Sequence, residues 1–390
     1  MFENYETMNF AKIKVIGVGG GGCNAVNNMI DAKVKSAEFY TVNTDKQALL
    51  LSKVPDQNKI QIGERLTKGL GAGSNPEIGE QAAEETQDLL RAILEGTDLL
   101  FIAAGMGGGT GTGAAPVIAR IARELGVLTV AVVTKPFSFE GRIRSENAQK
   151  GILNLKKHVD TIVVIPNDKL LQLLPPQTAL SEAFKVADDT LKQGISGIVD
   201  LITTPSLINL DFADVNTIMK NQGLAHMGIG EAKGDNRILE AVRQAVSSPL
   251  LETTIEGAKG VIINVTGGND LTLGEANEAA RLVQGVVDYS ANIIFGTTVD
   301  EKMSNGVKIT LIATGFSPVP DGDYANSIQQ IQFVKAEEKV VEEEKIEEPI
   351  ATEEPELPEE PVVEEPVVET KAETKELPMF MRKLFGKKNK

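Results

Sequence analysis

The chain has 390 residues, of which 42% are apolar, and its formal net charge at pH 7 is −16. This length accommodates two domains with buried cores, and the negative charge argues against a nucleic-acid-binding protein, which usually carries a basic face. The single cysteine, Cys23, excludes an intramolecular disulfide framework and fits a reducing compartment. The apolar runs are shorter than the ~20 residues that span a bilayer, and residues 1–10 lack a signal-peptide pattern. We therefore expect a cytoplasmic protein.

The first half of the chain alternates strand-like apolar runs, glycine loops and helical stretches. This alternation predicts an α/β domain with a mostly parallel, Rossmann-like sheet and helices on both of its faces. Ligands bind such sheets at the carboxyl ends of the strands, which is where the glycines lie here. The expected strands cover 12–19, 37–44, 99–105, 128–134 and 161–166, with helices at 80–94 and 114–124, in a domain of residues 12–177 that follows a flexible N-terminus (1–11).

A long amphipathic helix is expected next. Apolar residues recur at spacings of three and four from Leu180 to Ile202, and Pro205 would end the helix. We place this central helix at 178–204. Residues 205–318 predict a smaller α+β domain, which lacks a glycine loop of the phosphate-binding kind. Its expected helices cover 237–247 and 273–288, and its strands cover 261–266, 292–298 and 307–315.

The first glycine loop has the sequence GVGGGGCN and covers residues 17–24. It follows a strand, opens a helix and fits the G-x-G-x-x-G pattern of dinucleotide-binding proteins, with Asp45 placed to bind a ribose. By itself this loop leaves a nicotinamide or flavin enzyme open as an alternative.

The second glycine loop, GGGTGTG at residues 107–113, decides between these alternatives. Its glycines let the backbone approach an anion, so that backbone N–H groups and a helix N-terminus bind phosphate oxygens, while Thr110 and Thr112 add hydroxyl donors. Two opposed loops indicate a triphosphate held along its length. Neither loop carries the Gly-Lys-Ser/Thr of a Walker-type P-loop.

The GGGTGTG segment resembles the signature of the tubulin and FtsZ superfamily, and the order of motifs over about residues 10–318 is similar to that of bacterial FtsZ. The resemblance implies a polymerising GTPase that binds GTP or GDP with Mg²⁺ and assembles head to tail with copies of itself. It also implies that residues 43–45 form a loop of the site and that residues 72–76 close over the γ-phosphate. The implied nucleotide contacts are Gly20, Gly21, Gly22, Asn24, Asp45, Ala72, Gly73, Asn75, Gly107, Gly108, Gly109, Thr110, Gly111, Thr112, Gly113, Pro136, Glu140, Arg144, Asn167, Phe184 and Asp188.

Catalytic groups are expected in NLDFADV at residues 209–215. From the residue pattern alone, Asp211 and Asp214 are helix-capping candidates. The resemblance implies instead that this segment enters the neighbouring subunit's nucleotide site, where Asp211 and Asp214 position the attacking water and help place Mg²⁺, with Asn209 orienting them. No single subunit would then hold a complete site.

The C-terminal part has a different composition. Residues 335–376 contain 17 acidic and five basic residues with many prolines, which predicts a disordered, self-repelling linker over 319–375. The final segment, 376–390, resembles the FtsZ peptide that docks onto membrane-anchor and regulator proteins such as the actin-like FtsA. Contact with the membrane would be indirect.

Two other functions are open from the sequence. A nicotinamide-dependent oxidoreductase leaves GGGTGTG unexplained, and the two histidines, His158 and His226, are unaccompanied. A filament protein that binds nucleotide without hydrolysing it conflicts with the presence of Asn209, Asp211 and Asp214. The favoured expectation is a cytoskeletal GTPase of the midcell division ring.

Overall fold

The computed structural model describes residues 11–34, 37–172, 174–175, 177–203, 211–248, 250, 255–300, 303 and 305–316. The strands are β1 (Ile13–Val18), β2 (Glu38–Asn43), β3 (Lys59–Gln61), β4 (Leu99–Gly105), β5 (Leu128–Lys135), β6 (Thr161–Pro166), β7 (Gly223–Lys233), β8 (Gly260–Gly267), β9 (Asn292–Val299) and β10 (Gly306–Thr314). The helices are α1 (Gly19–Asp31), α2 (Lys46–Leu50), α3 (Glu64–Thr67), α4 (Pro76–Glu85), α5 (Gln87–Leu94), α6 (Thr110–Glu124), α7 (Arg142–Lys156), α8 (Asn167–Leu171), α9 (Leu180–Thr203), α10 (Phe212–Met219), α11 (Arg237–Val246) and α12 (Leu273–Gln284).

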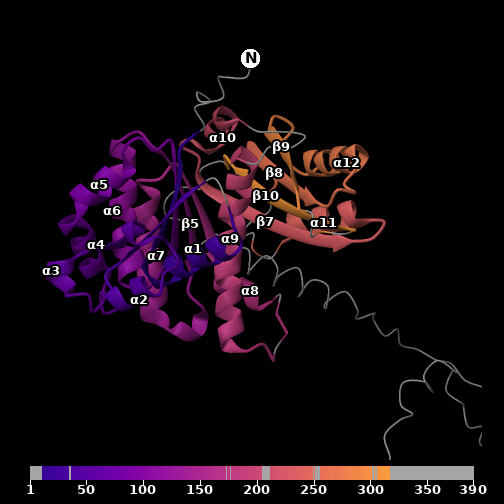
Figure 1. Cartoon of the computed structure of the whole chain (residues 1–390). Helices are drawn as coiled ribbons and strands as arrows, with labels where there is room; N and C mark the ends of the chain where they lie inside the picture. The colour runs from indigo at the N-terminus through magenta and orange to yellow at the C-terminus, as the bar shows by residue number, and fades with distance from the viewer. Residues whose placement is uncertain are drawn as a thin grey trace, which may run out of the picture. The chain divides into compact units, whose positions relative to one another are not determined.

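The strands form one hydrogen-bonded succession in the order β3-β2-β1-β4-β5-β6-β7-β10-β8-β9. From β3 to β6 every pair is parallel, as expected. Strand β7 continues this sheet, because its first residues pair in parallel with β6, and the same strand then pairs antiparallel with β10. Strand β8 is antiparallel to β10 and parallel to β9. A single strand therefore connects the parallel half to the mixed C-terminal half (Figure 1).

Helices cover both faces of the parallel half, as the sequence predicts. Consecutive strand residues point to opposite faces, so Phe101 packs in a core with α1, α9 and α10. Its neighbour Ile102 packs in a second core with α4, α5, α6 and α7. In the C-terminal half, α11 and α12 cover one face of β7, β8 and β10 in a third core.

Helix α9 packs against both halves of the sheet (Figure 1). Two glycines on its buried side allow this close approach. A Cβ atom added at Gly194 would lie 2.8 Å from the Met227 sulfur, and one added at Gly197 would lie 3.1 Å from Cγ2 of Thr310. Asn264 on β8 fixes the contact, since its side-chain amide donates to the carbonyl oxygen of Gly197 over 3.2 Å.

Several predicted element boundaries are wrong. The expected helix 80–94 is two helices that begin at Pro76 and break at Thr86, whose hydroxyl accepts from Gly63 N over 3.1 Å and donates to the Ala82 carbonyl. The expected helix 114–124 begins at Thr110, so half of the second glycine loop is a first helical turn. The first loop is likewise helical from Gly19. Helix 273–288 ends at Gln284, and β7 was not predicted.

Some predictions fall on residues that the structure does not describe. They are all but the last residue of the flexible N-terminus 1–11, Asn209, the end of the central helix at Pro205, the linker 319–375 and the peptide 376–390. Among the described helices, none combines the length and apolar character needed to cross a membrane.

Candidate nucleotide site

The N-termini of α1 and α6 lie against each other at the carboxyl ends of β1 and β4. A Cβ atom added at Gly19 would lie 2.8 Å from the backbone nitrogen of Gly111. Within the described residues, neither helix has a capping side chain or an acidic residue in its first turn. Their unpaired N–H groups and positive dipole ends therefore favour an anion in the same space. A Cβ atom at Gly20 would meet nothing within 4 Å, so this glycine borders open space.

The loop after β2 and the segment between β3 and α4 close one side of this space. Thr44 and Thr110 share a buried hydrogen bond of 2.7 Å between their hydroxyls. A Cβ atom added at Gly109 would lie 2.7 Å from Cβ of Ala72 and 2.9 Å from the carbonyl oxygen of Asn75. Asn75 caps α4 by accepting from Glu77 N over 3.0 Å. Gly73, with φ +58°, faces open space, so the residues predicted to close over the γ-phosphate border the glycine loops.

A second wall comes from residues 136–144, between β5 and α7. The Glu140 carboxylate accepts from Phe137 N over 2.9 Å and pairs with the Arg144 guanidinium over 2.5 Å. Arg144 in turn lies beside the second glycine loop, because a Cβ atom added at Gly107 would be 2.8 Å from its carbonyl oxygen. These contacts connect the wall to the phosphate-binding loop.

Asn167 and Asp188 lie at the other end of the site. Asn167 begins α8 directly after β6, and its buried Oδ1 has no hydrogen-bond partner among the described residues. An unpaired buried acceptor costs free energy unless a ligand donates to it. Burial raises the pKa of the Asp188 carboxyl to about 7, the charge of Asp189 adds to the rise, and a hydrogen bond with Asn24 opposes it.

An aromatic cluster borders these acceptors. Phe184 is 39% exposed, although it falls on the apolar stripe of α9. Its ring is perpendicular to that of buried Phe137, with a centroid distance of 5.3 Å, and also contacts Phe139 at 6.2 Å. Phe139 stacks on Phe137 and is 57% exposed. Exposed aromatic surface at this place can stack on a planar base.

The structure thus gathers the predicted nucleotide contacts at the carboxyl ends of the parallel strands, and their individual roles toward a nucleotide stay predictions. Sequence reasoning missed some neighbours. Two of them, Ser138 and Phe139, lie in the motif PFSFEG at 136–141, but their exposure and their contacts depend on the fold and cannot be inferred from the motif. The missed residues are Ser138, Phe139 and Asp168.

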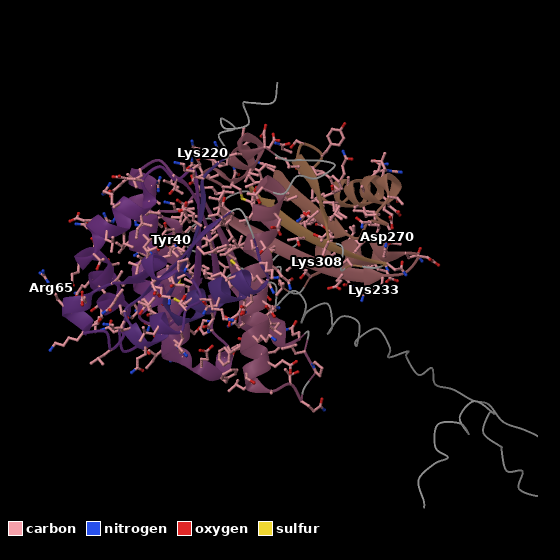
Figure 2. The ribbon with its side chains drawn as sticks, viewed as in Figure 1. Tyr40, Arg65, Lys220, Lys233, Asp270 and Lys308 are labelled. Carbon is pink, nitrogen blue, oxygen red and sulfur yellow. The ribbon has the colours of Figure 1, made fainter. Side chains whose placement is uncertain are left out.

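Asp211 and Asp214 lie at the opposite end of the sheet. Asp211 is the N-cap of α10 and accepts from Asp214 N over 2.8 Å. Next to them, Phe212 lines a cavity of about 460 Å³ together with Leu128, the first residue of β5, and Asp160, which precedes β6. Helix α10 therefore stands at the amino ends of these strands, whereas α2 and α8 stand at the other end (Figure 1). Figure 2 shows Lys220, which follows α10, at the same end as that helix.

Fold and site together define a nucleotide-binding α/β protein in which paired, uncapped helix N-termini are suited to binding phosphate. Comparison with known proteins gives the family. Residues 12–175 match the GTPase domain of the Tubulin/FtsZ family, and residues 223–317 match the FtsZ family C-terminal domain. The chain belongs to the Tubulin/FtsZ family and is a GTPase that binds GTP and GDP.

Solved structures agree with this assignment. An empty FtsZ dimer from M. jannaschii is 48% identical, with a TM-score of 0.77 over 80% of this chain and 90% of that one. A point mutant of FtsZ from M. jannaschii is also 48% identical, with a TM-score of 0.76 over 79% of this chain and 92% of that one. CetZ1 from Haloferax volcanii, a GDP-bound monomer, is 22% identical with a TM-score of 0.69 over 84% and 99% of the two chains, and shares the fold. Kinship to FtsZ supports a polymerising GTPase.

Proposed function

We propose that the chain assembles head to tail into filaments of a bacterial division ring and that GTP is hydrolysed at the joints between subunits. The observation that carries this proposal is the separation of two half-sites. The phosphate-binding helix N-termini lie at the carboxyl ends of β1 and β4, and the carboxylates of Asp211 and Asp214 lie with α10 at the amino ends of neighbouring strands. Stacking one subunit on the next along the strand direction brings the two half-sites together.

Such a contact uses different surfaces on the two partners. A heterologous contact of this kind does not need to close into a ring and can therefore continue into a filament. Asp211 uses Oδ1 to cap α10, which holds the carboxyl group in place and leaves Oδ2 for a water molecule. Asp214 is exposed in the first turn of the same helix. In the joint, these two carboxylates position and polarise the water that attacks the γ-phosphate.

A magnesium ion would be held mainly by the nucleotide. The described residues contain no group of three His, Cys, Asp or Glu side chains suited to a metal. Mg²⁺ fits such a site because it binds through substrate phosphates, water and one or two carboxylates. The carboxylates of Asp211 and Asp214, supplied by the next subunit, are the protein groups that would complete its shell, and the ion would neutralise charge on the phosphates.

The first experiment measures GTP hydrolysis per subunit across protein concentration, with light scattering in the same cuvette and Mg²⁺ present. We expect negligible activity at low concentration and a joint rise of activity and scattering above a threshold. Asp211→Asn should assemble and bind GTP but lose most of its turnover, whereas the exposed control Asp235→Asn should behave as wild type. Specific activity that is independent of concentration, with no scattering, would contradict the proposal.

The C-terminal peptide completes the proposed role in the cell. We propose that residues 376–390 dock onto FtsA-like membrane-anchor and regulator proteins, so that the filament works in the cytoplasm at midcell and contacts the membrane indirectly. Support comes from the Glu-Leu-Pro-Met-Phe order at 376–380 and from the family of the preceding residues. A deletion of 377–390 should abolish anchor binding in a pull-down while leaving GTP turnover unchanged. Full anchor binding by the truncated chain would remove this assignment.

A further inference from the structure

Asp168 and Ser138 form a contact between α8 and the segment that follows β5. Ser138 belongs to the segment after β5, and Asp168 is the second residue of α8, after β6. The two oxygens of the Asp168 carboxylate each accept a hydrogen bond from Ser138, over 2.8 Å from its backbone N–H and over 2.5 Å from its hydroxyl. Bonds to an ionised acceptor are stronger than neutral ones, and two of them fix direction as well as distance.

The groups on either side of this contact face the nucleotide space. Asn167, the neighbour of Asp168, carries the buried Oδ1 that has no partner among the described residues. Phe137 and Phe139, the neighbours of Ser138, pack against the exposed ring of Phe184. Any change in the spacing between residues 137–139 and α8 therefore changes where Asn167 stands relative to the aromatic rings.

We propose that Asp168 is a positioning residue: its paired hydrogen bonds to Ser138 hold residues 136–141 against α8 and so set the width of the pocket that receives the guanine base. Asp168 touches no part of the nucleotide in this arrangement and acts through Asn167 and the aromatic rings. This inference rests on the proposed nucleotide site and adds to it the element that makes it selective for guanine.

The contact also reaches the phosphate end. Glu140 lies two residues beyond Ser138 and bonds both Phe137 N and the Arg144 guanidinium. Arg144 lies beside Gly107 of the phosphate-binding loop. Glu140 keeps its bonds to Phe137 N and to Arg144 when the Ser138–Asp168 contact is lost, so Arg144 should stay beside Gly107 and the phosphates should stay bound. Base selectivity should suffer first.

Equilibrium binding of GTP and ITP below the assembly concentration tests this role. Inosine lacks the exocyclic amino group of guanine, so the ratio of the two affinities reports on the acceptors that face the base. Asp168→Ala should weaken GTP binding about tenfold, as expected from loss of a charge-assisted hydrogen bond, and should bring the GTP-to-ITP ratio close to one. Asp168→Asn should keep most of the GTP affinity and most of the GTP-to-ITP affinity ratio. Its amide oxygen can accept from Ser138 N, and its NH₂ group can donate to the Ser138 hydroxyl oxygen.

Two further variants keep the test decisive. Ser138→Ala removes one bond at an exposed position and should shift the ratio in the same direction by a smaller factor, even if Asp168→Ala lowers the thermal midpoint of unfolding. Asp88→Ala, in the first turn of α5, is the matched control and should leave the ratio unchanged. A GTP-to-ITP affinity ratio within twofold of wild type in both Asp168→Ala and Ser138→Ala would overturn the positioning role of Asp168. A wild-type chain that binds neither nucleotide would instead overturn the proposed function.

Discussion

At the scale of single residues, the predicted base-binding end of the site combines the unpaired amide oxygen of Asn167 with the carboxyl group of Asp188, whose pKa is raised. Burial brings the pKa of Asp188 to about 7, so near neutral pH the empty site holds a mixture of charged and neutral forms. Guanine N1–H and N2–H groups are donors, and they bind the carboxylate in preference to the carboxylic acid.

Nucleotide binding should therefore release a proton from Asp188. We expect GTP affinity to fall by up to tenfold for each pH unit below about 7 and to level off above it, as measured by titration calorimetry in buffers of different ionisation enthalpy. Asp188→Asn should bind GTP weakly with no pH dependence over this range. An affinity that stays constant between pH 5.5 and 8 in the wild type would contradict this prediction.

The same raised pKa has a consequence for the empty protein. Because the folded-state pKa lies above the ordinary value, Asp188 stabilises the fold at low pH, and this contribution is lost as the pH rises through about 7. In the absence of nucleotide, Asp188→Asn should raise the thermal midpoint of unfolding more at pH 8 than at pH 5. An equal rise of the thermal midpoint at both pH values would show that ionisation of Asp188 is not the cause of the stabilisation.

The sequence was informative about residues whose chemistry is local. The glycine runs at 17–22 and 107–113 predict phosphate binding because few other functions need so many glycines next to a helix start. Phe184 was harder to interpret, since the apolar spacing of α9 alone predicts a core residue. Its exposure follows from the position of α9, which extends past the sheet toward Phe139. The contact of Asp168 could not be predicted, because its partner, Ser138, lies 30 residues away in the sequence.

At the scale of elements, α4 and α6 pack with their backbones in contact. A Cβ atom added at Gly113 would lie 2.0 Å from the Pro76 carbonyl oxygen and 2.5 Å from Glu80 N, both of them backbone atoms that cannot turn away. Asn75, the N-cap of α4, therefore lies beside the first turn of α6, where the second glycine loop becomes helical.

Gly113→Ala should therefore lower the free energy of unfolding by about 3 kcal/mol, at the upper end of the cost of overpacking, as measured by urea denaturation. Gly20→Ala is the matched comparison, because its Cβ atom meets nothing within 4 Å. That variant should fold normally, or gain up to about 1 kcal/mol from helix propensity, and lose nucleotide affinity as the methyl group enters the phosphate space. Equal stability of the two variants would contradict the packing argument.

The missed strand β7 shows where local pattern fails. Its sequence, GLAHMGIGEAK, contains glycines that weaken a strand prediction. The structure explains them, since a Cβ atom at Gly228 or Gly230 would lie 2.0 Å from carbonyl oxygens of Ala245 and Ala241 on α11. The glycines serve helix–strand contact, which depends on a neighbour outside the strand. The other elements of this half, including α11 and β10, follow clear apolar periods and were predicted within a few residues.

At the scale of the whole molecule, charged side chains are partly buried where α9 meets the C-terminal strands. Burial raises the pKa of Asp200 on α9 to about 6, and the charge of Lys308 on β10 opposes the rise. Burial likewise lowers the pKa of Lys308, which pairs in register with Glu231 on β7 and also senses Lys192 and Asp189. Figure 2 shows Lys308 and Lys233 on these strands.

Ionisation of the Asp200 carboxyl should destabilise the contact between α9 and the C-terminal strands as the pH rises. Its folded-state pKa is above the ordinary value, so its stabilising contribution is present at low pH and is lost through about pH 6. We expect Asp200→Asn to raise the urea midpoint most at pH 8, by a smaller amount at pH 5, and hardly at all near pH 3, below the ordinary pKa of the carboxyl. A midpoint that falls at pH 8 would show that attraction to Lys308 outweighs the desolvation of the carboxylate.

The unpaired oxygen of Asn167, together with the uncapped N-termini of α1 and α6, has a consequence for the life of the protein in a cell. A nucleotide that bonds to these groups would bind the folded chain and not the unfolded one, and would therefore stabilise the fold. A ligand at 100 times its dissociation constant adds about 2.7 kcal/mol to the free energy of unfolding. The supply of guanine nucleotide would then govern how long each molecule survives proteases, and starvation for GTP would shrink the pool of subunits as well as stopping their assembly.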